Sequence, residues 1–122
     1  MAKATFSLAF LPLLVMFLFF NSGIQKQANA ADAVKTWCVA KPSANETQLG
    51  SNLEFACSQM KDGCKEIEFN GPCYMPNTTI SRASYAMNLY YALNGRNPWN
   101  CDFSGTGLVT TTDPGYGPCV YA

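Results

Sequence analysis

Histidine is absent from this chain of 122 residues. The side chain that exchanges protons most readily near neutral pH is therefore missing, so nucleophilic sites of the Ser-His-Asp or Cys-His kind are excluded. A zinc site is not expected either, because the chain also lacks a Cys-x-x-Cys pair. Glu66 and Glu68 are the nearest pair of carboxylates for cleaving a glycosidic bond, but strand alternation would place both on one solvated face. We therefore expect no catalysis, no cofactor and no metal.

An excess of charge of one sign is also missing. The chain has eight Lys and Arg against eight Asp and Glu. Lys3 and Lys26 lie in an N-terminal segment that we expect to be removed, which leaves six basic and eight acidic residues and a net charge of −2. Such a domain offers no basic surface for nucleic acid or for an anionic membrane.

The N-terminal segment has the order of a secretory signal peptide. A short start containing Lys3 precedes the nearly all-apolar run Phe6–Phe20, and Ala28-Asn29-Ala30 follows as a cleavage site. The alternative is a membrane anchor, which needs ~20 apolar residues, and this run is shorter. The C-terminal end shows none of the pattern of a lipid-anchor signal, so we expect a secreted protein with no membrane anchor. The expected divisions are a signal peptide at 1–30, a short leader at 31–36 and one domain at 37–122.

Six cysteines follow the expected cleavage site, at positions 38, 57, 64, 73, 101 and 119. An even number of cysteines in a short exported chain predicts three disulfides. A domain this small buries too little apolar surface to be stable without such links. The spacing alone leaves about 15 pairings open.

Two helices are predicted from apolar residues at helical spacing. The first begins with Asn45 or Thr47 as its cap and ends at Asp62-Gly63. The second begins with Asn77 or Thr78 as its cap and ends at Asn94-Gly95.

Three segments are predicted to be extended. Trp37-Cys38-Val39 is a brief one, and Cys64–Phe69 alternates polar and apolar residues as a strand does. Leu108–Thr112 is rich in β-branched residues, and Cys119–Tyr121 is its expected partner.

Two sequons, Asn45-Glu46-Thr47 and Asn77-Thr78-Thr79, are expected to accept N-linked glycans. Each asparagine also lies where a helix cap is predicted. A cap is a surface position, so the two roles are compatible.

Aromatic residues are abundant for so small a domain, at 13% of the chain. Rings suit sugar binding because the C–H face of a β-glucose ring is apolar, while neighbouring polar groups bond the hydroxyls. Small domains also use rings as core, and we expect this of Trp37 and Phe55. Tyr90 and Tyr91 cannot both face inward from one helix, so one should be exposed. Trp99, in a loop between polar residues, is the most plausible ligand platform.

Several runs resemble the plant family 43 carbohydrate-binding module, also called the X-8 domain. They are Trp37–Pro42, Phe69–Thr79, Ser84–Tyr91, Cys101–Gly105 and Thr110–Cys119, with all six cysteines in order. The resemblance covers Thr36 to Tyr121. It implies a small disulfide-rich α+β fold, in which two helices pack with a small antiparallel sheet and long coils. It also implies the pairs Cys38–Cys101, Cys57–Cys64 and Cys73–Cys119.

The resemblance implies a function as well. Family members bind β-1,3-glucan (callose-type chains), either attached to plant glucan endo-1,3-β-glucosidases or alone, as in plasmodesmata callose-binding proteins. We expect a monomeric, non-catalytic β-1,3-glucan-binding protein of the plant apoplast or cell wall, with plasmodesmal association as a further option. The alternatives are a structural or protein-interaction module on the same scaffold, or a secreted defence protein.

Chemistry and position select eight residues as candidates for contact with the sugar. The expected stacking residues are Tyr85, Tyr90, Tyr91, Trp99 and Phe103, and the expected hydrogen-bonding residues are Asn94, Arg96 and Asp102.

Overall fold

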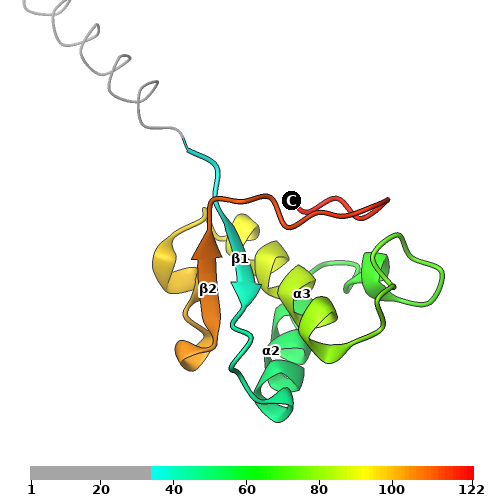
Figure 1. The fold of residues 1–122 in the computed structure, drawn as a ribbon, viewed down its shortest axis with the longest axis horizontal. Helices are drawn as coiled ribbons and strands as arrows, with labels where there is room; N and C mark the ends of the chain where they lie inside the picture. Colours follow the sequence, from blue (N-terminus) through cyan, green and yellow to red (C-terminus); the bar gives the residue numbers. More distant parts are fainter. Residues whose placement is uncertain (1–33) are drawn as a thin grey trace, which may run out of the picture. The chain divides into compact units, whose positions relative to one another are not determined.

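The computed structural model describes residues 34–122, which form two helices and a small sheet (Figure 1). The predicted signal peptide at 1–30 lies outside the described residues. The elements are β1 (Trp37–Ala40), α2 (Glu46–Ser58), a 3-10 turn (Lys65–Ile67), α3 (Thr79–Leu93), two further 3-10 turns (Pro98–Cys101 and Phe103–Gly105) and β2 (Gly107–Thr110). The expected fold class, with two helices, an antiparallel sheet and three disulfides, is confirmed. Among residues 34–122, no helix has both the length and the apolar character to cross a bilayer.

Both helices begin where capping residues were predicted. Asn45 Oδ1 accepts a hydrogen bond from the backbone N–H of Gln48 at 2.7 Å, and Thr78 Oγ1 accepts one from Ser81 at 3.3 Å. These bonds satisfy N–H groups that have no partner within the first helical turn. The helix α2 ends at Ser58, earlier than predicted. The residues that follow form tight turns inside the short loop that the Cys57–Cys64 disulfide closes.

The sheet joins β1 and β2 in antiparallel register, with Trp37 opposite Thr110 and Ala40 opposite Gly107. The prediction that Cys119–Tyr121 pairs with Leu108–Thr112 is wrong. Cys119 instead forms an isolated bridge with Tyr116. The Cys38–Cys101 disulfide brings the chain that enters β2 against β1. A side chain at position 107 would overlap the carbonyl oxygen of Cys101, so only glycine permits this close approach.

The predicted strand over Cys64–Phe69 is also wrong. The segment forms the 3-10 turn Lys65–Ile67, and the N–H of Cys73 returns to the carbonyl of Glu66 at 2.8 Å. Gly71 packs directly on the backbone of Glu66, where a Cβ atom would overlap it. These local contacts replace strand pairing in this segment. Glu66 is half-buried and Glu68 is exposed, so the two side chains do not share one solvated face.

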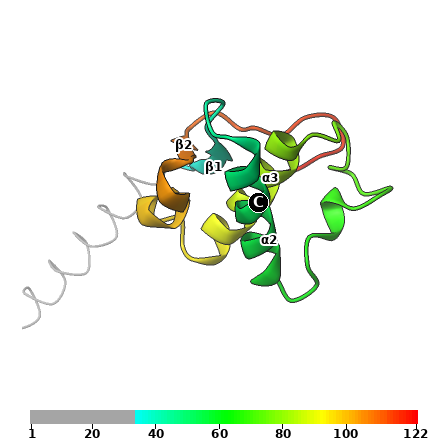
Figure 2. The same cartoon turned by 90° about the horizontal axis from the view of Figure 1, so that it is seen from below.

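The central element is α3, which packs on α2 and on β1. Figure 2 shows the two helices side by side, with the sheet to one side of them. Apolar residues from these elements form two core clusters, and five of the six cysteines are buried in them. The disulfides are Cys38–Cys101, Cys57–Cys64 and Cys73–Cys119, which confirms the pairing that the resemblance implied.

Polar side chains of α3 complete the hydrogen bonding of β1. The N–H of Cys38 donates to Asn88 Oδ1 at 2.9 Å, and the N–H of Ala40 donates to Ser84 Oγ at 2.9 Å. Asn88 is only 1% exposed, and its Nδ2 donates to the carbonyl of Ala122 at 3.0 Å. One edge of β1 thus pairs with β2, and the other is covered by α3.

Removing the Cys38–Cys101 link should destabilise the protein more than removing Cys57–Cys64. The first closes a sequence separation of 63 residues and the second a separation of 7. Loop-closure entropy then gives costs of about 4 and about 2 kcal/mol, respectively. Paired Cys→Ala variants unfolded in urea would test this order, and an equal loss in the two variants would contradict it.

Asn88→Ala should lower the free energy of unfolding by about 2–4 kcal/mol, because it leaves the buried N–H of Cys38 and the carbonyl of Ala122 without partners. Ser51→Ala, on the exposed face of α2, is the control and should change it by less than about 0.5 kcal/mol. Urea unfolding followed by circular dichroism measures both. Equal stability of the two variants would show that the network contributes nothing.

Candidate functional site

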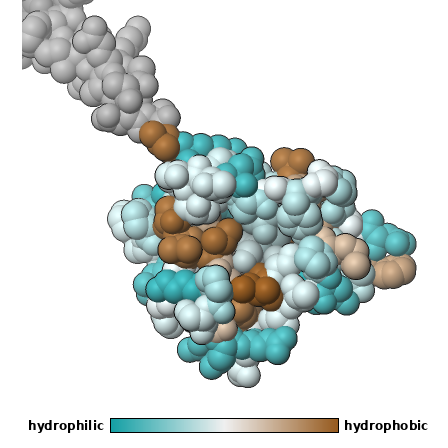
Figure 3. Space-filling view, in the orientation of Figure 1, coloured by the Kyte–Doolittle hydropathy of each residue, from teal (hydrophilic) through white to brown (hydrophobic). Residues whose placement is uncertain are grey.

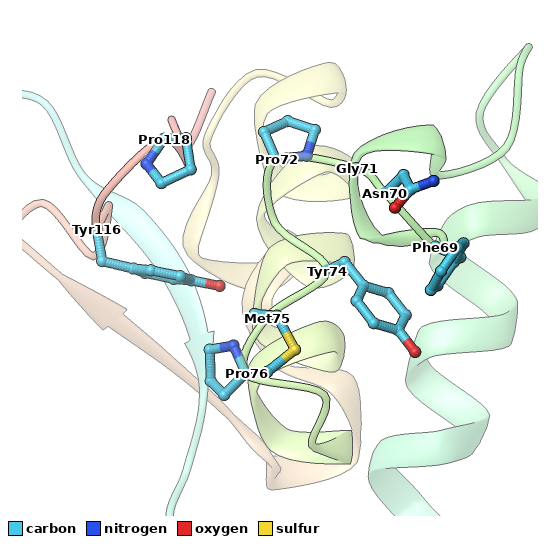
Figure 4. A pocket seen from close by; sticks show the side chains of 9 residues that line it. All are labelled: Phe69, Asn70, Gly71, Pro72, Tyr74, Met75, Pro76, Tyr116 and Pro118. Atoms are coloured by element: carbon cyan, nitrogen blue, oxygen red, sulfur yellow. The ribbon is translucent and has the colours of Figure 1, made fainter.

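The described residues form an aromatic groove of about 840 Å³ at the surface. Figure 4 shows Tyr116 and Pro118 on one side of it, and Phe69 and Tyr74 on the other. We call these residues together the groove: Phe69, Asn70, Gly71, Pro72, Tyr74, Met75, Pro76, Tyr116 and Pro118. Most of its lining is ring or apolar surface.

The two sides of the groove come from segments far apart in the sequence. The Cys73–Cys119 disulfide joins them directly. On one side, Tyr116 and Cys119 exchange two backbone hydrogen bonds, at 2.8 and 3.1 Å, which close the turn that carries Pro118. The Tyr116 hydroxyl lies 3.3 Å from Ser81 Oγ of α3, which holds the ring in place. The groove is therefore a constrained surface, although it is built from coil.

Large apolar side chains in the groove are exposed. Phe69 is 76% exposed and Met75 is 66% exposed. Phe69 meets the ring of Tyr74 edge to face, with 5.6 Å between the ring centroids, inside the range of about 4.5–7 Å typical of aromatic pairs. Because exposing such side chains to water is unfavourable, a cluster of them beside a hollow is a typical ligand-binding surface.

Three of the predicted stacking residues retain exposed ring surface. Trp99 is 72% exposed on the turn Pro98–Cys101, while Tyr90 and Phe103 are half-buried. Tyr90 lies between Phe55 and Phe103 at centroid distances of 5.2 and 5.6 Å. The structure thus brings Tyr90 and Phe103 together with Phe55, which was expected in the core but is 47% exposed. None of these residues lines the groove.

The other two predicted stacking residues lie in the core. Tyr91 is 1% exposed, and its hydroxyl lies 2.6 Å from Thr36 Oγ1. Tyr85 is 5% exposed and packs edge to face on Tyr121 at 5.2 Å. Stacking of a sugar on either ring would require that ring to leave the core. One of Tyr90 and Tyr91 was expected to be exposed, but Tyr91 is buried and Tyr90 is half-buried against the core.

Two of the predicted hydrogen-bonding residues have structural partners. Asn94 Nδ2 donates to the carbonyl of Tyr90 at 2.8 Å, which closes the end of α3. Arg96 Nη1 donates to the carbonyl of Thr36 at 2.7 Å. Asp102 is exposed beside Phe103 and is the freest of the three to meet a ligand.

The sequence reasoning missed the groove because it treated Cys64–Phe69 as a strand and Asn70-Gly71-Pro72 as a simple turn. A signal was present, since Phe69, Tyr74 and Met75 are large apolar residues in a turn-rich segment that has no helical or strand partner.

Residues 34–122 contain no cluster of three or more His, Cys, Asp or Glu side chains that could hold a metal ion.

Other apolar surface lies over the sheet, as Figure 3 shows. Leu108 and Val109 of β2 are 46% and 39% exposed there. In Figure 1, the helices separate β2 from the loop that carries most of the groove. The two apolar surfaces are therefore distinct.

The fold and the groove define a class: a small disulfide-linked α+β domain whose surface aromatic residues line a hollow. Comparison with known proteins gives the family, since residues 36–108 match the model of the X8 domain. The chain belongs to the X8 domain family.

Relatives of the chain fall into two groups by length. It is 49% identical over 87 residues to the major pollen allergen Ole e 10 of Olea europaea, and the match covers 71% of each chain. It is also 49% identical over 87 residues to a glucan endo-1,3-beta-D-glucosidase of the same species, but this match covers only 19% of the enzyme. A glucan endo-1,3-beta-glucosidase of Triticum aestivum is 49% identical over 85 residues, with 18% of its length covered. The chain thus corresponds to one module of these enzymes.

Two buried tyrosines make the stability sensitive to alkali. Burial, reinforced by the Glu66 carboxylate, raises the pKa of Tyr85 to about 12. Burial also raises the pKa of Tyr121, with Tyr116 and Tyr85 adding to the effect. The unfolded chain, whose tyrosines titrate near pH 10, loses these protons first.

The free energy of unfolding should therefore fall as the pH rises from about 10 through 12, and these two phenols should make no such difference below about pH 10. Titration of the absorbance near 295 nm should show late-ionising tyrosines in the folded protein. Tyr85→Phe should remove part of that late phase and reduce the alkaline loss of stability. Titration of all six tyrosines together near pH 10 in the folded protein would contradict the prediction.

Proposed function

We propose that this protein is a secreted, non-catalytic β-1,3-glucan-binding protein and that the glucan binds in the groove. The observation that carries the proposal is the cluster of three rings, the exposed Phe69 and the half-buried Tyr74 and Tyr116, around a hollow of about 840 Å³. Family membership supports the ligand class, because related segments form part of enzymes whose names state action on 1,3-β-glucan.

The chemistry of the groove suits a sugar chain. Each β-glucose ring has an apolar C–H face, which the side chains of Phe69, Tyr74 and Tyr116 can cover. The Asn70 side chain and the Tyr74 hydroxyl supply the few polar groups needed to bond sugar hydroxyls. Because the groove is open at the surface, it suits a polymer better than a small enclosed molecule.

A binding role, and not hydrolysis, fits the carboxylates in this region. Glu66 is half-buried beside the Tyr85 phenol, whereas Glu68 is exposed. Hydrolysis of glycosides needs two carboxyl groups on opposite sides of one bond, and neither glutamate lines the groove.

Secretion to the plant cell wall fits the three disulfides, which persist in an oxidising compartment. The N-terminal sequence pattern of residues 1–30 supports the same route. We propose a monomer there, with no cofactor. Of the residues selected from sequence, Tyr90, Trp99, Phe103 and Asp102 stay as candidates for a second contact with a long chain.

Phe69→Ala should weaken binding to laminarin about tenfold, because it removes one stacking ring, which corresponds to roughly 1.4 kcal/mol. The side chain is 76% exposed, so its loss should leave the fold intact. Trp99→Ala is the comparison variant, since this ring is similarly exposed, at 72%, and belongs to the rival surface selected from sequence, not to the groove. Affinity electrophoresis in gels containing laminarin, cellulose-type or xylan-type polysaccharide measures both variants.

The outcomes separate the candidates. Loss of affinity in Phe69→Ala alone supports the groove, whereas loss in Trp99→Ala alone moves the site to the surface selected from sequence. Unchanged mobility of the folded wild-type protein in every gel would reject glucan binding, and would favour a protein-interaction, structural or defence role for the same scaffold. Release of reducing sugar from laminarin would reject the non-catalytic assignment.

A further inference from the structure

The two sequons lie at the neighbouring starts of the two helices. Thr79, the hydroxyl residue of the second sequon, donates from Oγ1 to Glu46 Oε1 of the first sequon at 2.9 Å. Both asparagines are exposed. Their side-chain amides, however, make different contacts, and an N-linked glycan is attached through the amide nitrogen.

The side chain of Asn45 caps α2 and does not line the groove. Its Oδ1 atom caps α2 by accepting from Gln48 at 2.7 Å, and this carbonyl oxygen is kept when Nδ2 is glycosylated. The residues on either side of it, Ala44 and Glu46, line a small hollow with Thr78 and Thr79, and none of these residues lines the groove.

The amide of Asn77 lies at the rim of the groove. Asn77 directly follows Pro76, which lines the groove, and its Nδ2 donates to the Tyr74 hydroxyl at 3.2 Å. Figure 4 shows Pro76 and Tyr74 among the residues that border the groove. A sugar attached at Nδ2 therefore begins at an atom that is hydrogen-bonded to the hydroxyl of Tyr74, which lines the groove.

We propose that Asn77 is N-glycosylated and that its glycan partly covers the groove, which makes ligand access depend on occupancy of this sequon. In the modification, Nδ2 forms a bond to the anomeric carbon of a lipid-pyrophosphate-linked oligosaccharide. The bond from that carbon to the pyrophosphate oxygen breaks, and one amide proton is lost. The remaining N–H can still donate to the Tyr74 hydroxyl, which keeps the attachment point at the rim of the groove.

The attached glycan competes with the glucan for the same surface. Its first residue, a β-linked N-acetylglucosamine, has an apolar ring face like that of glucose and is held close to the rings at high effective concentration. If the groove is open for about a tenth to a third of the time, the apparent affinity for glucan falls about 3- to 10-fold. This consequence for glucan rests on the proposed function, whereas occupancy and covering of the groove do not.

The test uses the full chain secreted by a plant or yeast host, with Thr79→Val to remove the Asn77 sequon and Thr47→Val as the matched control at Asn45. Peptide mass spectrometry should find a glycan at Asn77 in the wild type and in Thr47→Val, and none in Thr79→Val. Laminarin affinity should be about 3- to 10-fold higher for Thr79→Val and unchanged for Thr47→Val. Enzymatic removal of glycans from the folded wild type should give the same gain without any substitution.

A second readout does not depend on glucan. Met75 lines the groove and is 66% exposed, so peroxide should oxidise it faster once the glycan is removed. An unmodified Asn77 would overturn the proposal, and so would equal oxidation of Met75 before and after deglycosylation. Faster oxidation without laminarin binding by any form would support covering of the groove and reject the proposed function instead.

Discussion

The hydrogen bonds from β1 to Ser84 and Asn88 are the interaction on which the rest of this fold depends. A two-stranded sheet has little stability of its own, and here α3 replaces the missing third strand. These bonds hold the helix core against the only sheet of the described residues. Asn88 also donates from Nδ2 to the carbonyl of Ala122, so the C-terminal segment that carries Tyr116 is held against the same helix.

The groove shows how a small domain can build a defined surface from coil. Residues 69–76 and 116–119 contain no helix or strand, but the Cys73–Cys119 disulfide and the bond between Tyr116 and Ser81 join them to each other and to α3. Phe69 and Met75 stay exposed on this surface, at 76% and 66%. Such covalent support replaces the large core that a chain of this size cannot form.

Sequence patterns predicted the helices well because their signals are local. Asn45 and Thr78 bond N–H groups three residues away, so the cap and the start of each helix are encoded together. The extended segments at Trp37–Val39 and Leu108–Thr112 were predicted correctly, but the partner of the second and the strand over Cys64–Phe69 were not. Cys64–Phe69 has the alternation of a strand but no partner to pair with, and Leu108 pairs with Val39, which is distant in the sequence. Alternation is a property of one segment, whereas a sheet requires a second segment to pair with it.

The sequence by itself determined the number of disulfides, the two helices, the absence of histidine chemistry and, through its resemblance to a known family, the fold and the cysteine pairing. Only the tertiary structure decided which aromatic residues are core and which are surface. Tyr85 and Tyr91 are buried while Phe69 is exposed, although all three are aromatic residues in runs typical of the family. Burial depends on what packs against a ring, and here the covering groups come from residues far along the chain, such as Thr36 and Tyr121.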